Sequence, residues 1–179
     1  MRSTRFSFFI IISFIVCLLS ACTTSDYAKK TGYARKAVKQ RKHVYTPPPT
    51  AAQSELMMIA MSLLTVNYKY GGVTPDGFDC SGYVNYVFKE AWGQKLPRTA
   101  ADISKFGKKV DNETLQQGDL VFYNTMRRPY SHVGIYIGDN QFVHSPSKGK
   151  KVRVEDMSQP YWQARFNGAR RISAPKHFL

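Results

Sequence analysis

The chain has 179 residues, of which 43% are hydrophobic and 21% charged, and its 26 Lys and Arg against 12 Asp and Glu give a formal net charge of +14. Roughly 100–200 residues per domain are usual, so this length predicts one folded domain, and the apolar fraction excludes global disorder. Three cysteines are too few for a disulfide scaffold. The charge alone permits a nucleic acid, an acidic polymer or a membrane surface as the partner.

Residues 1–21 have the pattern of a signal peptide. Arg2 and Arg5 precede 14 mostly apolar residues, 6–19. That run has the length of a signal-peptide core and is short for a spanning helix, which needs about 20 residues. An uncleaved N-terminal anchor is the alternative.

The end of this segment, Leu19-Ser20-Ala21-Cys22, resembles the bacterial lipobox. The resemblance implies that Cys22 is lipidated and becomes the mature N-terminus. Thr23 follows the cysteine, where an Asp would retain an enterobacterial lipoprotein at the inner membrane. The expected location is therefore the outer membrane, with a lipid anchor and the domain facing the periplasm.

Residues 22–49 are predicted to form a basic, disordered tether. Seven Lys and Arg oppose two acids between Thr23 and Glu55, and large apolar residues are almost absent. Such a segment buries too little apolar surface to offset the entropy of ordering. It would be a flexible linker that lets the anchored domain move relative to the membrane, or alternatively a solvated spacer with no specific contact.

The folded domain is expected over residues 50–179. Thr50 to Gln53 fits a capping box, and apolar residues at helical spacing predict a helix near 51–64. A second helix is predicted to begin near Cys80 with Asp79 as its N-cap, and a short third one over 97–106.

After Gly118 the apolar period changes to two, which predicts strands. They are expected at 119–124, 132–137, 141–145, 152–155 and 169–172. Helices first and strands afterwards predict an α+β fold, with N-terminal helices packed on a five-to-six-stranded antiparallel sheet.

Cys80 is the only thiol that remains in the folded domain once Cys17 leaves with the signal peptide and Cys22 carries lipid. An unpaired thiol in an exported protein is a liability unless it has a function. The N-terminus of a helix favours an anion, so we expect the pKa of Cys80 to be lowered towards neutrality. An inert buried cysteine is the alternative.

Of four histidines, His43 and His177 lie in the tether and near the C-terminus and are assigned no role. His132 and His144 flank a predicted turn at 138–140. The apolar alternation predicts a hairpin register in which paired residue numbers sum to an even value such as 278, through an odd-length or bulged turn, so both histidines share one face.

In that arrangement His132 would take the Cys80 proton and later protonate the leaving amine, while His144 would orient His132. A zinc site made of Cys80 and the two histidines is the competing hypothesis. The carboxylates lack ligand spacing, so we expect no metal, and no organic cofactor either.

Six segments of the domain together resemble the NlpC family of bacterial cell-wall cysteine peptidases. The resemblance covers roughly residues 55–173, and its segments are Tyr68-Lys69-Tyr70-Gly71-Gly72, Phe78-Asp79-Cys80-Ser81-Gly82-Tyr83-Val84, Leu96-Pro97-Arg98-Thr99, Gly118-Asp119-Leu120-Val121-Phe122, Ser131-His132-Val133-Gly134-Ile135-Tyr136-Ile137-Gly138 and Phe142-Val143-His144. It implies a papain-like α+β fold and hydrolysis of peptidoglycan stem peptides, often between D-glutamate and diaminopimelate.

The resemblance also implies roles for single residues. Cys80 would be the nucleophile, His132 the base and His144 the orienting residue, and Tyr68 would help to hold the oxyanion or the substrate. Asp79 and Ser81 match positions that often contact the free amine of a stem peptide. For Asp79, capping of the helix is the alternative role.

These observations predict a monomeric outer-membrane lipoprotein that cuts peptidoglycan stem peptides or cross-links, with nucleic acid excluded as a partner. A non-catalytic wall-binding lipoprotein, or an amidase or acyltransferase on the same fold, are the alternatives. Basic residues near the histidine strands would steer acidic stem peptides or form a solvated surface; they are Arg127, Arg128, Lys148, Lys150, Lys151 and Arg153.

Overall fold

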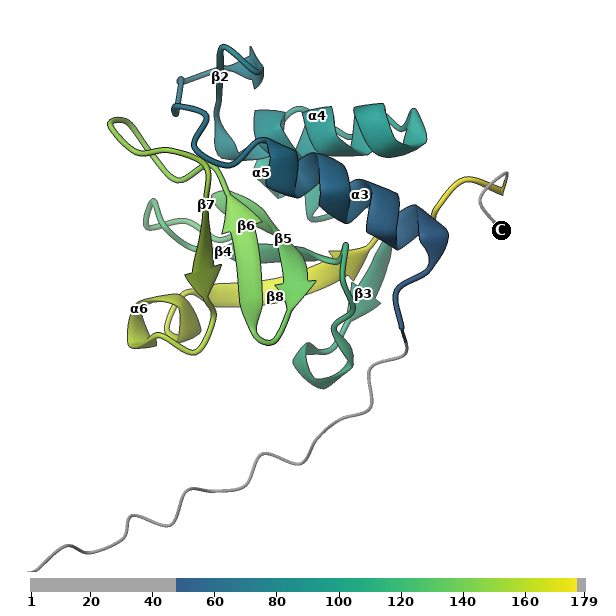
Figure 1. The fold of residues 1–179 in the computed structure, drawn as a ribbon. Coiled ribbons are helices and arrows are strands. Elements are labelled where there is room, and N and C mark those ends of the chain that lie inside the picture. Colours follow the sequence, from purple (N-terminus) through teal and green to yellow (C-terminus); the bar gives the residue numbers. More distant parts are fainter. Residues whose placement is uncertain (1–47, 177–179) are drawn as a thin grey trace, which may run out of the picture. The chain divides into compact units, whose positions relative to one another are not determined.

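The computed structural model describes residues 48–176 (Figure 1). The predicted signal peptide, Cys22 and the tether up to residue 47 lie outside this range, so those expectations stay predictions. Among the described residues, no helix is both long and apolar enough to span a bilayer.

The helices begin where capping residues dictate. Helix α3 (Ala51–Ser62) starts at the predicted capping box, in which the Gln53 N–H donates to Thr50 Oγ1 (3.2 Å) and the Thr50 N–H donates to Gln53 Oε1 (2.9 Å). Helix α4 (Cys80–Trp92) follows the N-cap Asp79, as predicted, and ends at Gly93 with φ 64°.

Two further helices depart from the prediction. Helix α5 spans only Ala100–Ile103, because Thr99 is its N-cap, where a helix over 97–106 was expected. Helix α6 (Pro160–Gln163), with Pro at its first position, was not predicted. A short 3₁₀ turn, η1, covers Asn112–Thr114.

The six-stranded sheet is antiparallel, in the order β3-β8-β4-β5-β6-β7. Its strands are β3 (Lys108–Val110), β4 (Leu120–Tyr123), β5 (His132–Gly138), β6 (Gln141–His144), β7 (Arg153–Asp156) and β8 (Phe166–Arg171). A separate hairpin pairs β1 (Val73–Thr74) with β2 (Gly77–Phe78). The α+β prediction is confirmed. Strands β1, β2 and β3 were missed, because two or three residues are too few to show an alternation.

The β5–β6 hairpin has the predicted register. Ile135 pairs with Val143 and Tyr136 with Phe142, so both pairs sum to 278. The register shifts before Gly138, and Asp139 and Asn140 form the turn with left-handed φ values of 47° and 58°. The bulged turn therefore puts His132 and His144 on one face of the sheet.

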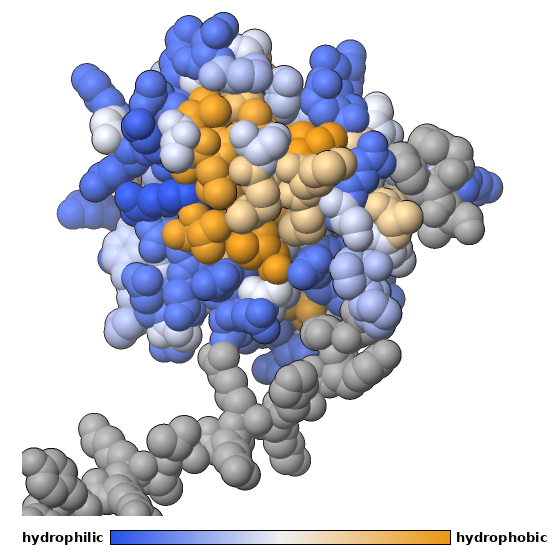
Figure 2. All heavy atoms as spheres, in the orientation of Figure 1, coloured by the Kyte–Doolittle hydropathy of each residue, from blue (hydrophilic) through white to orange (hydrophobic). Residues whose placement is uncertain are grey.

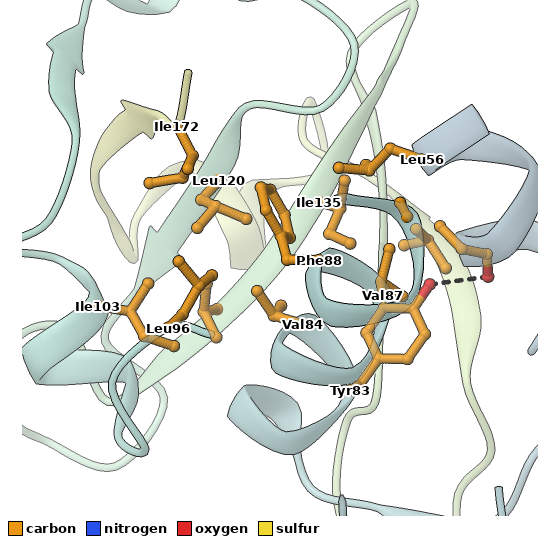
Figure 3. Packing of buried hydrophobic residues seen from close by; sticks show 14 of the residues in the cluster. Leu56, Tyr83, Val84, Val87, Phe88, Leu96, Ile103, Leu120, Ile135 and Ile172 are labelled. Carbon is orange, nitrogen blue, oxygen red and sulfur yellow. Dashed lines mark hydrogen bonds between the residues drawn. The ribbon is translucent and has the colours of Figure 1, made fainter. Parts of the chain in front are cut away.

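Two apolar clusters cover opposite faces of the sheet. Alternate residues of β4 divide between them: Leu120 and Phe122 pack with α3, α4 and α5 (Figure 3), whereas Val121 and Tyr123 pack with Trp162 of α6. Tyr83 is buried in the first cluster and donates its hydroxyl to the Ala60 carbonyl (2.8 Å).

Helix α3 is apolar on more than its buried side. Figure 2 shows hydrophobic surface around this helix, and Met58 and Met61 are exposed there. The low helical periodicity of its apolar residues, which include three methionines, accounts for this surface.

Candidate active site

Cys80 is the first residue of α4, and its position is fixed by close backbone packing. The Asp79 N–H donates to the Gly72 carbonyl (3.1 Å), and Ser145 Oγ donates to the Phe78 carbonyl (2.7 Å). A Cβ at Gly82 would lie 2.0 Å from the Gly72 oxygen. Only glycine therefore lets the first turn of α4 approach this segment so closely.

The thiol lies beside the strand that carries His132. The backbone of Val133, the residue after His132, is close enough to lower the pKa of Cys80. Within residues 48–176 no hydrogen bond joins the Cys80 thiol to His132. The structure thus places the Cys80 thiol at the meeting of α4 and β5, next to the backbone of the residue that follows His132, without a hydrogen bond between thiol and imidazole.

The expected low pKa of Cys80 is wrong. Burial of the thiol and the negative charge of Asp79 raise its pKa to about 11, although backbone groups of Val133 and Ser81 act in the opposite direction. Removing a thiolate from water is unfavourable, and here that effect exceeds the stabilisation available at a helix N-terminus. Cys80 therefore rests as a neutral thiol near pH 7.

His132 and His144 form the predicted pair. His132 Nε2 and His144 Nδ1 are 2.6 Å apart, and the rings are nearly perpendicular at 89°. Gly134 makes this possible, since a Cβ there would lie 2.6 Å from the Phe142 ring and 3.2 Å from the His144 Cβ. With Nε2 engaged, Nδ1 is the His132 nitrogen left for a proton from Cys80.

Both imidazoles are buried, with exposures of 4% for His132 and 0% for His144. Burial lowers the pKa of His132 to about 4, and burial together with the neighbouring His132 and Arg153 lowers the pKa of His144. Both rings are therefore neutral near pH 7, and a neutral imidazole is able to accept a proton.

Trp162 of α6 covers the histidine pair. Its ring centroid lies 6.1 Å from that of His132, with the planes at 25°, and 5.2 Å from that of His144. His144 Nε2 is buried and has no hydrogen-bond partner among the described residues. Sequence reasoning missed Trp162; Pro160 at the first position of a helix was the available signal.

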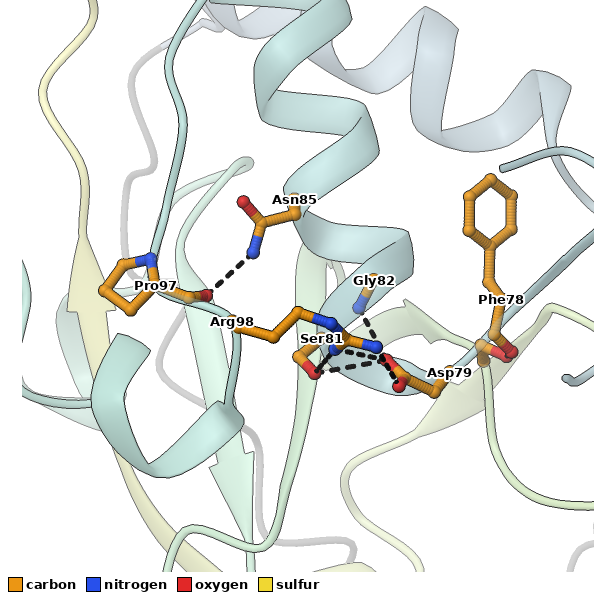
Figure 4. A network of polar contacts seen from close by, with 8 residues as sticks. Phe78, Asp79, Ser81, Gly82, Asn85, Pro97 and Arg98 are labelled. Atoms are coloured by element: carbon orange, nitrogen blue, oxygen red, sulfur yellow. Dashed lines mark hydrogen bonds and ion pairs between the residues drawn. The ribbon is translucent and has the colours of Figure 1, made fainter. Parts of the chain in front are cut away.

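Asp79 caps α4 and binds a guanidinium (Figure 4). Its carboxylate accepts from the Gly82 N–H (2.7 Å), from Ser81 Oγ (3.1 Å) and from Arg98 Nη2 (2.6 Å), and Arg98 Nη1 also donates to Ser81 Oγ (2.9 Å). Burial raises the pKa of Asp79, but the hydrogen bonds from Arg98 and Gly82 outweigh burial and hold it below its usual value. Asp79 therefore caps α4, as the alternative role required, and it also forms a polar cluster with Ser81 and Arg98.

Arg98 belongs to the motif Leu96-Pro97-Arg98-Thr99, but the sequence alone predicted no role for it. Asn85 on α4 holds the preceding segment, because its amide donates to the Pro97 carbonyl (2.8 Å) and accepts from the Leu96 N–H (2.9 Å). These bonds bring Arg98 to Asp79 across 19 positions of sequence. Neither the apolar period nor the spacing of charged residues predicts the contact between Arg98 and Asp79.

Tyr68 also reaches the cluster around Cys80. It is half-buried, and burial and the charges of Cys80 and Asp79 raise the pKa of its hydroxyl. Its N–H donates to the Lys150 carbonyl (2.9 Å), which ties the segment to the loop after β6. The structure thus brings Tyr68, Asp79, Cys80 and Ser81 to one end of α4. Among residues 48–176, no group of three or more His, Cys, Asp or Glu is arranged to hold a metal.

Comparison with known proteins identifies the family. The chain is 36% identical over 171 residues to "Murein DD-endopeptidase MepS/Murein LD-carboxypeptidase" of Escherichia coli K12, covering 88% of each chain. It is 39% identical over 126 residues to "Gamma-DL-glutamyl hydrolase" of Bacillus subtilis, covering 69% of this chain and 30% of that protein. The crystal structure of an NlpC/P60 family protein from Bacillus cereus superposes with a TM-score of 0.64 at 34% identity, over 69% of this chain and 41% of that one. The model of the NlpC/P60 family matches residues 65–171. The chain therefore belongs to the NlpC/P60 family.

Proposed function

We propose that the chain is a peptidoglycan hydrolase, a cysteine endopeptidase that cuts peptides of the cell wall. The observation that carries this proposal is the placement of Cys80 at the start of α4, near the Val133 backbone, while the preceding residue, His132, forms a buried pair with His144. The E. coli relative is named a murein DD-endopeptidase and the B. subtilis relative a γ-DL-glutamyl hydrolase, and both names support the same substrate class.

The reaction begins with two neutral groups. As Cys80 Sγ attacks the scissile carbonyl carbon, its proton passes to His132 Nδ1, and an S–C bond forms. His132 then donates that proton to the leaving nitrogen as the C–N bond breaks. Water, deprotonated by His132, releases the acid from the thioester and restores the thiol.

His144 keeps His132 in the useful tautomer. When His132 Nε2 carries a proton and donates it to His144 Nδ1, the lone pair of His132 is on Nδ1, where the Cys80 proton must go. The oxyanion would be held by the Cys80 backbone N–H and by the hydroxyl of Tyr68, which lies near the thiol.

The polar cluster at the start of α4 supplies the proposed contact with substrate amine. Asp79 and Ser81 would accept from the free amine of a stem peptide. Arg98 already forms an ion pair with Asp79, so the amine would share this carboxylate with the guanidinium. The cluster is charged and near the nucleophile, which suits the polar end of a short peptide.

The bond and the cellular location belong to the proposal as well. The candidate bonds are the D-glutamyl–diaminopimelate bond and a cross-bridge. The proposed enzyme is a monomer held at the outer membrane by lipid on Cys22 and faces the periplasm, which would limit its range to the wall nearby. Labelling with a fatty-acid analogue, compared between the wild type and Cys22→Ala, tests the anchor.

Digestion of purified sacculi tests the activity. The wild type should release muropeptides that mass spectrometry identifies as peptide-bond products, and Cys80→Ala should release none. Equal release by the two proteins would contradict thiol catalysis. Free lactoyl ends or whole stem peptides would favour an amidase, and binding without any release would favour a wall-binding protein.

A further inference from the structure

A hollow lies at the end of the sheet where β5 begins, apart from the residues described above. Its volume is about 430 Å³, and its lining residues come from the β4–β5 loop and from α6 and its end; they are Asn124, Thr125, Arg127, Tyr161, Ala164 and Arg165. We call it the arginine hollow. Neither Cys80 nor the histidines line it, so the arginine hollow has no role in the catalytic steps proposed above.

The lining carries two positive charges and no negative one. Neither Arg127 nor Arg165 forms an ion pair with a carboxylate in the part of the chain that the structure describes. Guanidinium groups bind carboxylates through paired N–H donors. Two unneutralised guanidiniums around one hollow are therefore suited to an anion.

Arg165 is held in place within the hollow. Its Cζ lies 3.9 Å from the centroid of the Tyr161 ring, and its Nη1 donates to the Tyr161 carbonyl (3.1 Å). Stacking on an aromatic face and one backbone bond leave its other N–H donors for a ligand. Little side-chain entropy remains to be lost on binding.

The opposite wall is a structured loop. Ser131 Oγ accepts from the N–H groups of Thr125 (3.0 Å) and Met126 (3.1 Å). Arg127 has a φ of 57°, a conformation that is unfavourable for a residue with a side chain and persists only where the surroundings impose it. The loop thus fixes the backbone from which Arg127 reaches the hollow.

One intermediate residue on each side links the arginine hollow to the histidine pair, Tyr123 in β4 and Trp162 in α6. Asn124 follows Tyr123, which pairs with His132 across β4 and β5. The Tyr161 ring packs on Trp162 at 4.9 Å, and Trp162 covers both imidazoles.

We propose that the arginine hollow binds a carboxylate of the peptidoglycan peptide, away from the bond that is cut. This inference rests on the proposed function and adds a specificity site to it. Stem peptides carry free carboxylates on D-glutamate and diaminopimelate, and two arginines without ion pairs around one hollow match such a carboxylate. Arg127 and Arg165 would thereby position the peptide while Cys80 attacks it.

Calorimetric binding to the full chain carrying Cys80→Ala tests the proposal without turnover. The ligands are a soluble cross-linked stem peptide and the same peptide with its carboxylates amidated. Arg127→Gln and Arg165→Gln should each weaken binding of the acidic peptide about tenfold, the range of one hydrogen bond to a charged group, and leave binding of the amidated peptide unchanged.

Arg128→Gln is the matched control, because it removes the same charge from the same loop at a residue that does not line the hollow. An equal weakening by Arg128→Gln would overturn the proposal in favour of general charge attraction. Equal binding of acidic and amidated peptides by the unsubstituted Cys80→Ala chain, or no binding of either, would overturn it too. Circular dichroism and thermal melts verify folding, and Arg165→Lys, which keeps the charge without the planar fork, should fall between wild type and Arg165→Gln.

Two further arms separate the possible failures. Hydrolysis of both peptides by the wild type tests the proposed function alone: turnover with no arginine dependence overturns only the hollow. Vesicles of phosphatidylglycerol test lipid phosphate as the anion. If Arg127→Gln abolishes vesicle binding but leaves peptide binding unchanged, the carboxylate proposal is wrong.

Discussion

Burial and the neighbouring charge of Asp79 together decide the resting charge of Cys80, and burial has the larger effect. Asp79 lies next to Cys80 in sequence and raises its pKa, while Arg98 and Gly82 hold the Asp79 carboxylate through hydrogen bonds. Because these bonds also keep Asp79 ionised, the cap that begins α4 simultaneously disfavours a thiolate. Burial also keeps His132 neutral near pH 7, because it lowers the pKa of the imidazole.

This balance predicts how the thiol reacts with pH. Iodoacetamide reacts with thiolate, so alkylation of Cys80 should accelerate steadily from pH 7 towards an apparent pKa near 11. Mass spectrometry at fixed times gives the rates. A plateau of fast alkylation already at pH 6 would indicate a thiolate–imidazolium pair and contradict two neutral groups. Asp79→Asn should shift the profile to lower pH, since it removes the charge that raises the pKa.

The sequence predicts the contact between the two histidines but not the electrostatics of the thiol. The His132–His144 contact follows from the alternation of apolar residues in two neighbouring strands, and the observed pairs sum to 278 as predicted. The pKa of Cys80 does not follow in this way, because burial depends on how β5 covers the start of α4. The sequence indicates that Cys80 begins a helix, but it does not indicate that the thiol is buried there.

Helix α6 has only four residues, but it determines what covers the histidine pair. It puts Trp162 against His132, His144 and Phe142. Long helices and strands with clear periods were predicted at nearly their observed bounds, whereas β1, β2, β3 and α6 were missed. Two or three residues are too few to show a strand alternation, and the four residues of α6 make about one helical turn, which is too short to show a helical period.

Removing the Trp162 ring should therefore affect both stability and the histidines. Trp162→Ala is expected to lower the free energy of unfolding by about 3–5 kcal/mol, as for other buried large-to-small changes, and to admit water to the imidazoles. The pKa of His132 should then rise from about 4 towards 6.5. Denaturant titration and histidine NMR measure the two effects. Trp162→Phe keeps most of the packing and should change each much less; an unchanged His132 pKa in Trp162→Ala would show that the ring does not exclude water.

For the whole molecule, the buried imidazoles link folding to pH. The pKa of His132 is about 4 when folded and about 6.5 when exposed, so the unfolded chain binds a proton first as the pH falls. His144 is shifted in the same direction. Stability from these groups is fully present above pH 6.5 and is lost as the pH falls towards 4. The loss from His132 is roughly 3 kcal/mol by the usual conversion of pKa shifts.

Denaturant unfolding at pH 7.5 and pH 4.5 measures this loss. The wild type should be less stable at the lower pH, and the double variant His132→Gln, His144→Gln should lose much less over the same interval, whatever its stability at pH 7.5. The carboxyl of Asp79, whose pKa is below its usual value, contributes at still lower pH and is separated by the choice of this window. Parallel pH dependence in the two proteins would assign the acid sensitivity to other groups. A steeper loss in the wild type would show that the pair proposed to serve catalysis at neutral pH also makes the fold sensitive to acid, since both properties come from burying two neutral imidazoles side by side.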